Sequence, residues 1–229
     1  MITIKKIKKH SGRPVYAGID EAGRGPVIGP LVVGLIAGDE IDQINEHFIN
    51  AGVKDSKKLS RKKRSELYNM LIDNDSIGIY TAIIEAEDID RERKNISLND
   101  IEIKMMGGLI ELLKPEYAYI DACSSNAENF GTAISEKIKH HTKIIAEHKA
   151  DERYPIVSGA SIIAKVCRDL IIEDIKKKVQ YDFGSGYPSD PKTIKYISEP
   201  TGNDSKYVRH SWKTITRSKN MRVDDYDSV

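Results

Sequence analysis

Cysteine is scarce in this sequence, since Cys123 and Cys167 are the only two thiols among 229 residues. They form no Cys-x-x-Cys pair, and the histidines show no zinc-finger spacing. These absences exclude a disulfide-rich scaffold and argue against a small zinc-binding module. So few thiols are typical of a reduced, cytoplasmic protein, which is the location that we expect.

Long apolar segments are also lacking. The longest one, residues 27–37, is interrupted by glycines and Pro30 and is shorter than the ~20 residues of a membrane-spanning helix. Residues 1–13 contain five lysines and arginines with no apolar run behind them, which excludes a secretory signal. We therefore expect no membrane segment, and we expect residues 1–13 to form a basic arm.

Neither sign of charge is in excess. The chain has 36 Lys and Arg against 35 Asp and Glu, which gives a net charge of +1. This sum hides the distribution, because basic residues gather in residues 5–13, 54–64 and 206–222. With 39% hydrophobic residues, the composition is that of a globular protein and not of a disordered one.

The apolar pattern predicts strands that alternate with helices, which is typical of an α/β domain. The expected strands are residues 15–20, 27–37, 77–84, 117–122 and 142–147, and the expected helices are residues 60–72, 97–114, 127–140 and 158–180. Beyond residue 180, glycines and prolines separate short helical pieces. We therefore place an α/β domain at residues 14–180 and a helical C-terminal region with a frayed tail at residues 181–229.

Acidic residues follow three of the expected strands. Asp20 and Glu21 end the first strand, Asp121 ends the fourth, and Asp151 follows the last. Each acid alone could start a solvated turn or cap a helix. Because the carboxyl ends of parallel strands meet at one edge of an open α/β sheet, their repetition favours a shared site for a divalent cation such as Mg²⁺.

Glycine is dense just after the first strand, at Gly23, Gly25 and Gly29. Their spacing departs from Gly-x-Gly-x-x-Gly by one residue, and Pro26 removes an amide, so dinucleotide binding is not indicated. Glycines let another backbone approach closely and leave amides available for an anion.

Several segments together resemble ribonuclease HII of the archaeal type. They are residues 18–26 (GIDEAGRGP), 55–59 (DSKKL), 119–122 (YIDA), 149–151 (KAD) and 158–169 (SGASIIAKVCRD). The resemblance extends from Tyr16 to Trp212. It implies an RNase H-like α/β fold, with a mixed five-stranded sheet flanked by helices and a small helical C-terminal region.

The resemblance also implies roles for individual residues. Asp20, Glu21, Asp121 and Asp151 would be the catalytic carboxylates and would bind Mg²⁺ or Mn²⁺, with two ions during catalysis. The backbone of the Gly-Arg-Gly segment would read a ribose 2′-hydroxyl, which only RNA carries. The implied substrate-binding residues are Gly23, Arg24, Gly25, Lys57, Ser158, Ser161 and Tyr187.

Three of these substrate residues also have simpler interpretations. Tyr187 would pack on the deoxyribose beside the ribonucleotide, or it is an ordinary loop aromatic. Lys57 would contact a phosphate, or it belongs to a solvated run of charge. Ser158 would begin a helix whose free amides suit a phosphate, or it is only the helix cap.

The activity implied is that of an endoribonuclease that cuts the RNA strand of RNA/DNA hybrids and cleaves at ribonucleotides embedded in duplex DNA. In-line hydrolysis would leave 5′-phosphate and 3′-hydroxyl ends. We expect a monomer whose partners are these nucleic acids, with a replication clamp as a further candidate.

Two other functions are compatible with parts of the pattern. An actin-like or sugar-kinase-like ATPase also begins with an Asp after a strand, but it needs a hydroxyl residue and a glycine next, whereas Glu21 follows here. A non-catalytic nucleic-acid binder is suggested by the basic and aromatic residues 206–213. It gives no reason for aspartates at three strand ends.

Overall fold

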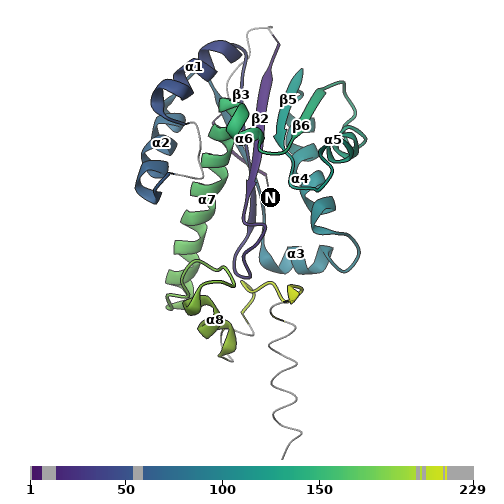
Figure 1. The fold of residues 1–229 in the computed structure, drawn as a ribbon. Coiled ribbons are helices and arrows are strands. Elements are labelled where there is room, and N and C mark those ends of the chain that lie inside the picture. The colour runs from purple at the N-terminus through teal and green to yellow at the C-terminus, as the bar shows by residue number, and fades with distance from the viewer. Residues whose placement is uncertain are drawn as a thin grey trace, which may run out of the picture. The chain divides into compact units, whose positions relative to one another are not determined.

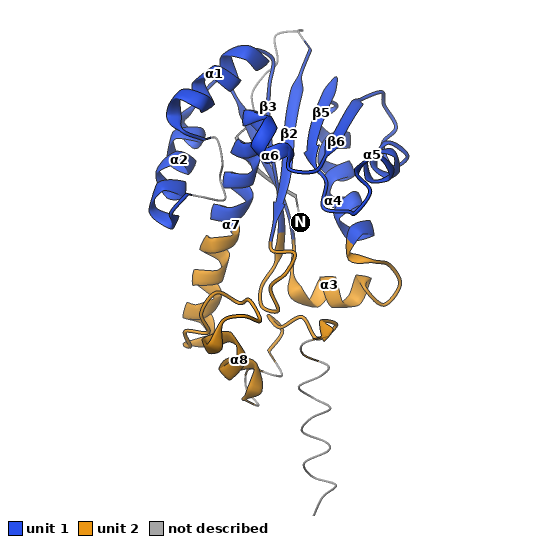
Figure 2. Cartoon of the chain, viewed as in Figure 1, with its two compact units in different colours: residues 1–22, 32–83, 99–167 blue, residues 23–31, 84–98, 168–229 orange. Residues whose placement is uncertain are grey.

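The computed structural model describes residues 2–6, 14–53, 59–199, 202, 205–213 and 215. Its contacts divide the chain into two compact units (Figure 2), which we name unit 1 and unit 2. Unit 1 comprises residues 1–22, 32–83 and 99–167, and unit 2 comprises residues 23–31, 84–98 and 168–229. The expected boundaries after residues 13 and 180 stay predictions. In this division residues 168–180 and two internal segments group with the C-terminal region.

A six-stranded mixed sheet, in the order β1-β4-β3-β2-β5-β6, forms the centre of the fold (Figure 1). Strand β2 pairs antiparallel with β3 and parallel with β5, β5 pairs parallel with β6, and β1 pairs antiparallel with β4. The strands are β1 (Ile2–Lys6), β2 (Tyr16–Ala22), β3 (Leu31–Gly38), β4 (Gly78–Ile84), β5 (Tyr117–Asp121) and β6 (Lys143–Glu147).

Strands β2 to β6 supply the mixed five-stranded sheet that the resemblance implies, and β1 adds a sixth strand at the edge. Residues 2–6 of the expected basic arm are thus a strand, which the β-branched residues Ile2, Thr3 and Ile4 favour. The strand expected over residues 27–37 begins only at Leu31. Gly29 has a φ of 87° and Pro30 cannot donate to a ladder, so both belong to the preceding loop.

The helices agree with the sequence pattern where amphipathic periodicity is long. Helices α2 and α4 lie within one residue of their expected bounds, α5 ends before residue 140, and α1, α3 and α6 were not predicted. The helices are α1 (Ile41–Ala51), α2 (Arg61–Asp73), α3 (Ala86–Glu92), α4 (Leu98–Leu113), α5 (Ala127–Ser135), α6 (Ala150–Arg153), α7 (Pro155–Val179) and α8 (Pro191–Ser198). None of these helices, as far as the structure describes them, has the length and apolarity to cross a membrane.

Helices cover both faces of the sheet in unit 1. On one face, residues such as Ile19 and Ile120 share a buried cluster with Met106 of α4 and Phe130 of α5. On the other face, glycines of β2 and β3 allow α7 to approach closely. A Cβ atom on Gly34 would lie 2.5 Å from the Ala160 carbonyl oxygen of α7. Because strand side chains alternate between faces, Gly18 and Asp20 share the α7 face while Ile19 enters the opposite cluster.

The close approach of α7 to β3 predicts that Gly34→Ala destabilises the protein by about 2 kcal/mol or more, since the clash is with backbone atoms that cannot rotate away. Gly107→Ala in α4 is the matched control. Its Cβ atom would lie 3.5 Å from the Lys137 Cβ atom, and alanine favours a helix by about 0.5–1 kcal/mol. Urea denaturation of both variants measures the difference, and equal stabilities would contradict the packing described.

Candidate active site

Three aspartates meet at the carboxyl ends of the parallel strands. The register pairs Ile19 of β2 with Ile120 of β5, so Asp20 and Asp121 are the next residues on neighbouring strands. Asp151 lies in α6, just after β6. Oxygen atoms of the three carboxylates all lie within 4.8 Å of one another. The structure thus brings together three of the four acids that the sequence singled out.

Local backbone contacts hold these carboxylates in place. The Glu21 amide donates to the Asp20 Oδ1 atom at 2.7 Å, and the Ala150 amide donates to the Asp121 Oδ1 atom at 3.0 Å. Asp20 is only 4% exposed and Asp151 only 2%. Since amides donate to two of the three groups, their orientation is set before any ligand binds.

The pKa of Asp20 shows the electrostatic consequence of this arrangement. Burial raises it most, and the nearby charge of Asp121 raises it further, with a smaller contribution from Asp151. A hydrogen bond from the Ser161 hydroxyl and the charge of Lys165 offset only part of this effect, so the pKa of Asp20 is raised to about 7.

The donor set therefore fits a divalent cation. Hard ions such as Mg²⁺ and Mn²⁺ prefer carboxylate oxygens, and a bound ion would stabilise the ionised form of Asp20, which burial and the nearby charge of Asp121 disfavour. Asp20, Asp121 and Asp151 are the residues that would hold it.

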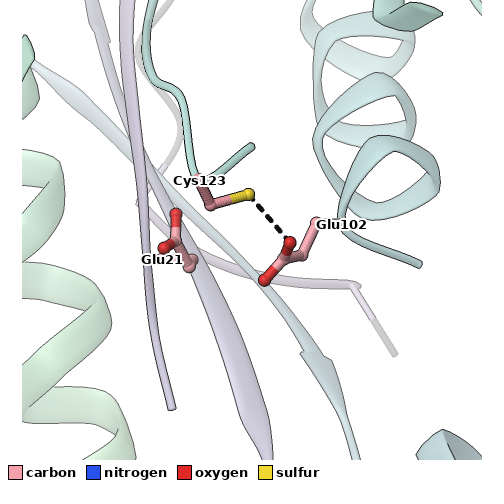
Figure 3. Close-up of side chains that lie close together, drawn as sticks. All are labelled: Glu21, Glu102 and Cys123. Carbon is pink, nitrogen blue, oxygen red and sulfur yellow. Dashed lines mark hydrogen bonds between the residues drawn. The ribbon is translucent and has the colours of Figure 1, made fainter. Parts of the chain in front are cut away.

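Glu21 points to the opposite face of β2. Its carboxylate groups with Glu102 of α4 and with Cys123, and ligand atoms of these three residues also lie within 4.8 Å of one another (Figure 3). The Cys123 thiol donates to the Glu102 Oε2 atom at 2.8 Å. The separation from Asp20 follows from the alternation of side chains along a strand. Glu102 is fully buried, and the helical periodicity of α4 gave no signal for it.

The glycine-rich loop that follows β2 lies in unit 2 and is tied down by its backbone. The amides of Val27 and Ile28 donate to the Gly186 carbonyl at 2.8 and 3.2 Å, and the Gly29 amide donates to the Tyr207 carbonyl at 2.8 Å. Gly23 has a φ of 98°, and a Cβ atom there would lie 2.5 Å from the Pro30 carbonyl oxygen. Glycine is thus required at residue 23 by the loop itself.

Two buried arginines support the same loop, and sequence reasoning missed both. Arg168 of α7 donates to the Ile28 carbonyl at 3.1 Å. The Arg209 Nε atom donates to the Gly29 carbonyl at 2.8 Å. Burial lowers the pKa of Arg168, because a buried guanidinium loses its hydration. The hydrogen bond to the Ile28 carbonyl offsets part of this loss of free energy. In the sequence, Arg168 lies in an amphipathic helix and Arg209 in a basic segment. Both patterns are typical of surface charges, so the contacts of these side chains with the loop were not predicted.

Tyr187 lies beside this loop in unit 2. The centre of its ring lies 5.5 Å from the Arg168 guanidinium carbon, and Tyr187 is 40% exposed. A Cβ atom on Gly25 would contact this ring at 3.5 Å. An exposed glycine backbone therefore lies next to an aromatic face that a buried cation supports.

Comparison with known proteins matches residues 17–215 to the family model described as ribonuclease HII. The chain belongs to the ribonuclease HII family. It is therefore an endonuclease of the hydrolase class, and the family supports cleavage of RNA/DNA hybrids as its activity.

Individual relatives cover most of the chain. The ribonuclease HII of Methanosarcina barkeri is 44% identical over 213 residues, which are 88% of this chain and 93% of that protein. Ribonuclease H2 from Pyrococcus horikoshii OT3 matches with a TM-score of 0.80 and 39% identity over 90% of this chain and 98% of its own. The RNase HII structure solved in complex with PCNA from Archaeoglobus fulgidus matches with a TM-score of 0.78 and 40% identity, over 87% and 95% of the two chains. The RNase H-like fold is confirmed.

Three further substrate residues implied by the ribonuclease HII resemblance are Lys57, Ser158 and Ser161, and their contact with a phosphate stays a prediction. Lys57 lies outside the described residues. Ser158 does not begin the long helix, because α7 starts at Pro155, whose ring suits the first turn. Ser158 is fully buried and its hydroxyl donates to the Val53 carbonyl, and Ser161 is fully buried beside Asp20. The structure thus gives both serines a packing or positioning role and no free helix end.

The raised pKa of Asp20 predicts how the stability of the protein depends on pH. The folded protein holds this proton more tightly than the unfolded chain, so without metal the stability falls as the pH rises from 3.8 to about 7. Asp20→Asn removes the charge and should raise the free energy of unfolding in EDTA at pH 8 by on the order of a few kcal/mol.

The same variant tests metal binding by thermal unfolding. Mn²⁺ should raise the melting temperature of the unaltered protein at pH 8, and Asp20→Asn should lose most of that rise. Asp88→Asn removes an exposed carboxylate that pairs with Arg91, and it should keep the full effect of Mn²⁺. An equal rise in both variants would show that the three aspartates are not the ion's ligands.

Proposed function

We propose that this enzyme hydrolyses the RNA strand of RNA/DNA hybrids and also cleaves at ribonucleotides embedded in duplex DNA. The observation that carries the proposal is the cluster of Asp20, Asp121 and Asp151. Two of these carboxylates are buried and that of Asp121 is partly buried, and their mutual repulsion suits the cations that phosphodiester hydrolysis uses. Membership of the ribonuclease HII family supplies the reaction class.

The aspartates would hold two divalent ions, Mg²⁺ or Mn²⁺. When bound, such a pair supplies the positive charge that stabilises in-line attack of water at phosphorus, with 5′-phosphate and 3′-hydroxyl products. The chain contributes fixed geometry, because the Glu21 and Ala150 amides orient Asp20 and Asp121. Lys165 and Ser161 favour the ionised form of Asp20. Glu21 stays in the proposed ligand set on the resemblance, while its carboxylate groups with Glu102 and Cys123 in the structure.

Choice of RNA would rest on the Gly-Arg-Gly segment and Tyr187. A ribose can press against backbone only where no side chain intervenes, and Gly25 is exposed. Beside it, the Tyr187 ring offers an apolar face for the neighbouring deoxyribose. Arg24 would add positive charge next to the substrate backbone.

The partners proposed are the hybrid and the ribonucleotide-containing duplex, which a monomer would bind. A replication clamp is a further proposed partner, supported by the Archaeoglobus fulgidus relative that was solved with PCNA. We place the enzyme in the cytoplasm on its thiol content, and we assign Lys57 to a phosphate on the resemblance alone.

Asp121→Asn should lower the cleavage rate by at least about a thousandfold, because it removes one carboxylate from the cluster while leaving an isosteric acceptor for the Ala150 amide. Binding of the hybrid should change by less than about threefold, since the aspartates contact the substrate only through ions. Single-turnover cleavage with Mg²⁺ and Mn²⁺, and fluorescence anisotropy for binding, measure the two quantities.

Glu21→Gln is the informative comparison for the same assay. A loss as large as that of Asp121→Asn would place Glu21 among the ligands, whereas a small loss would restrict the site to the three aspartates. Near-normal cleavage by Asp121→Asn itself would refute the proposed mechanism.

Substitution in the glycine loop tests the reading of the 2′-hydroxyl. A substitution of Gly23 would strain the loop, because residue 23 has a positive φ, so an effect on folding could not be separated from an effect on recognition of the 2′-hydroxyl. Gly25→Ala should leave folding unchanged, since the added Cβ atom makes only an ordinary contact with the Tyr187 ring. We expect Gly25→Ala to lower kcat/KM at a single embedded ribonucleotide by about tenfold or more, because the methyl group blocks the approach of the ribose.

The control for this variant is its thermal stability and its affinity for an all-DNA duplex, both of which should match the unaltered protein. Unchanged cleavage at the single ribonucleotide would remove Gly25 from the recognition site.

A further inference from the structure

We propose that a pocket within unit 2 binds a phosphodiester group of the nucleic-acid duplex, separately from the aspartate cluster. The pocket has a volume of about 510 Å³. It is lined by Arg24, Gly25, Arg93, Leu98, Ser211, Trp212 and Lys213, and we name it the Arg93 pocket. The inference rests on the proposed function and adds to it a second place where the duplex backbone is held.

The charge of the lining residues points to an anion. Arg24, Arg93 and Lys213 supply three cations, and no carboxylate is among the described residues that line the pocket. The nearby acid, Asp90 of α3, accepts hydrogen bonds from the amides of His210 and Ser211 at 2.7 and 2.9 Å. Asp90 therefore fixes the backbone that carries Ser211 and Lys213.

Trp212 positions guanidinium groups and does not present an open stacking platform. The guanidinium carbons of Arg93 and Arg209 lie 5.1 and 4.8 Å from the centre of the indole ring. Such cation-π contacts hold a long arginine side chain in one place. Because the ring already contacts two cations, the pocket is suited to a phosphate and poorly suited to a base that must stack on the indole.

Two polar atoms of residues that line the pocket lack a hydrogen-bond partner among the described residues. The Arg93 Nε atom and the Ser211 Oγ atom are buried and make no hydrogen bond with the part of the chain that the structure describes. A buried donor without a partner is costly, and a phosphate oxygen would supply the missing acceptor. Arginine is also the side chain whose fork matches two phosphate oxygens.

The pocket also adjoins the segment assigned to the ribose. Arg24 and Gly25 line it directly, and the Arg24 carbonyl accepts a hydrogen bond from the Arg209 Nη1 atom at 3.5 Å. Arg209 thus touches both the indole and the glycine loop. A duplex whose ribose lies against Gly25 would bring its own backbone within reach of Arg93 and Lys213, so the phosphodiester should be near the ribonucleotide.

Binding of a duplex with one embedded ribonucleotide to the full chain tests the pocket. The Asp121→Asn variant, which should bind without cutting, is the parent. In this background Arg93→Gln and Lys213→Gln should each weaken binding by about tenfold and lower the slope of log affinity against log salt by about one. The matched control is Arg91→Gln, two residues earlier in the last turn of α3, where an exposed arginine pairs with Asp88. Its affinity and slope should equal those of the parent.

A scan with single neutral methylphosphonates locates the phosphate. At one position near the ribonucleotide, neutralisation should weaken binding by the parent about tenfold and should not weaken binding by Arg93→Gln further, because the contact is already lost. Lys213 is exposed, so Lys213→Gln keeps the test valid even where Arg93→Gln loses stability in thermal unfolding.

The outcomes separate the two proposals. If the unaltered enzyme cleaves the duplex but Arg93→Gln and Lys213→Gln bind like Arg91→Gln, or if every methylphosphonate affects Arg93→Gln and the parent equally, the pocket does not hold a phosphate. If the unaltered enzyme neither binds nor cleaves the duplex, the proposed function itself fails.

Discussion

Repulsion among the carboxylates of Asp20, Asp121 and Asp151, two of them buried and that of Asp121 partly buried, explains how this site is built. Parallel pairing of β2 with β5 fixes Asp20 beside Asp121, and α6 brings Asp151 to the same point. Because hydrogen bonds hold β2 beside β5, Asp20 and Asp121 cannot move apart to relieve the repulsion. This repulsion contributes to the raised pKa of Asp20, and a divalent cation is the ligand that would relieve it.

The sheet also determines which acidic side chains lie close to one another. Side chains alternate along β2, so Asp20 faces Ser161 and Lys165 of α7, whereas Glu21 lies with Glu102 on the side of α4. Two neighbouring carboxylates in the sequence therefore have different surroundings. Glycines at residues 18 and 34 let α7 lie close enough to contact Asp20, so packing of the core and placement of the site are parts of one arrangement.

Contacts within unit 2 hold the glycine-rich loop that follows β2 in one conformation. The amides of the loop after Gly23 donate to the carbonyls of Gly186 and Tyr207, and the guanidinium groups of Arg168 and Arg209 donate to carbonyls of the same loop. Burying two cations costs free energy, and carbonyl oxygens of the loop offset that cost. The result is a glycine backbone that is exposed at residue 25 and yet ordered, which recognition of a small hydroxyl group needs.

The α/β class, most strands and the long helices could be predicted from the sequence, because they follow from local periodicity and from the positions of glycine and proline. The sequence also indicated that Asp20, Asp121 and Asp151 could share a site, since each follows a strand. Only the tertiary structure decided that Glu21 joins Glu102 and Cys123, that Ser158 is buried, and that Arg168 and Arg209 support the glycine loop. Those contacts join residues far apart in the chain, and burial of a charge depends on neighbours that no local pattern specifies.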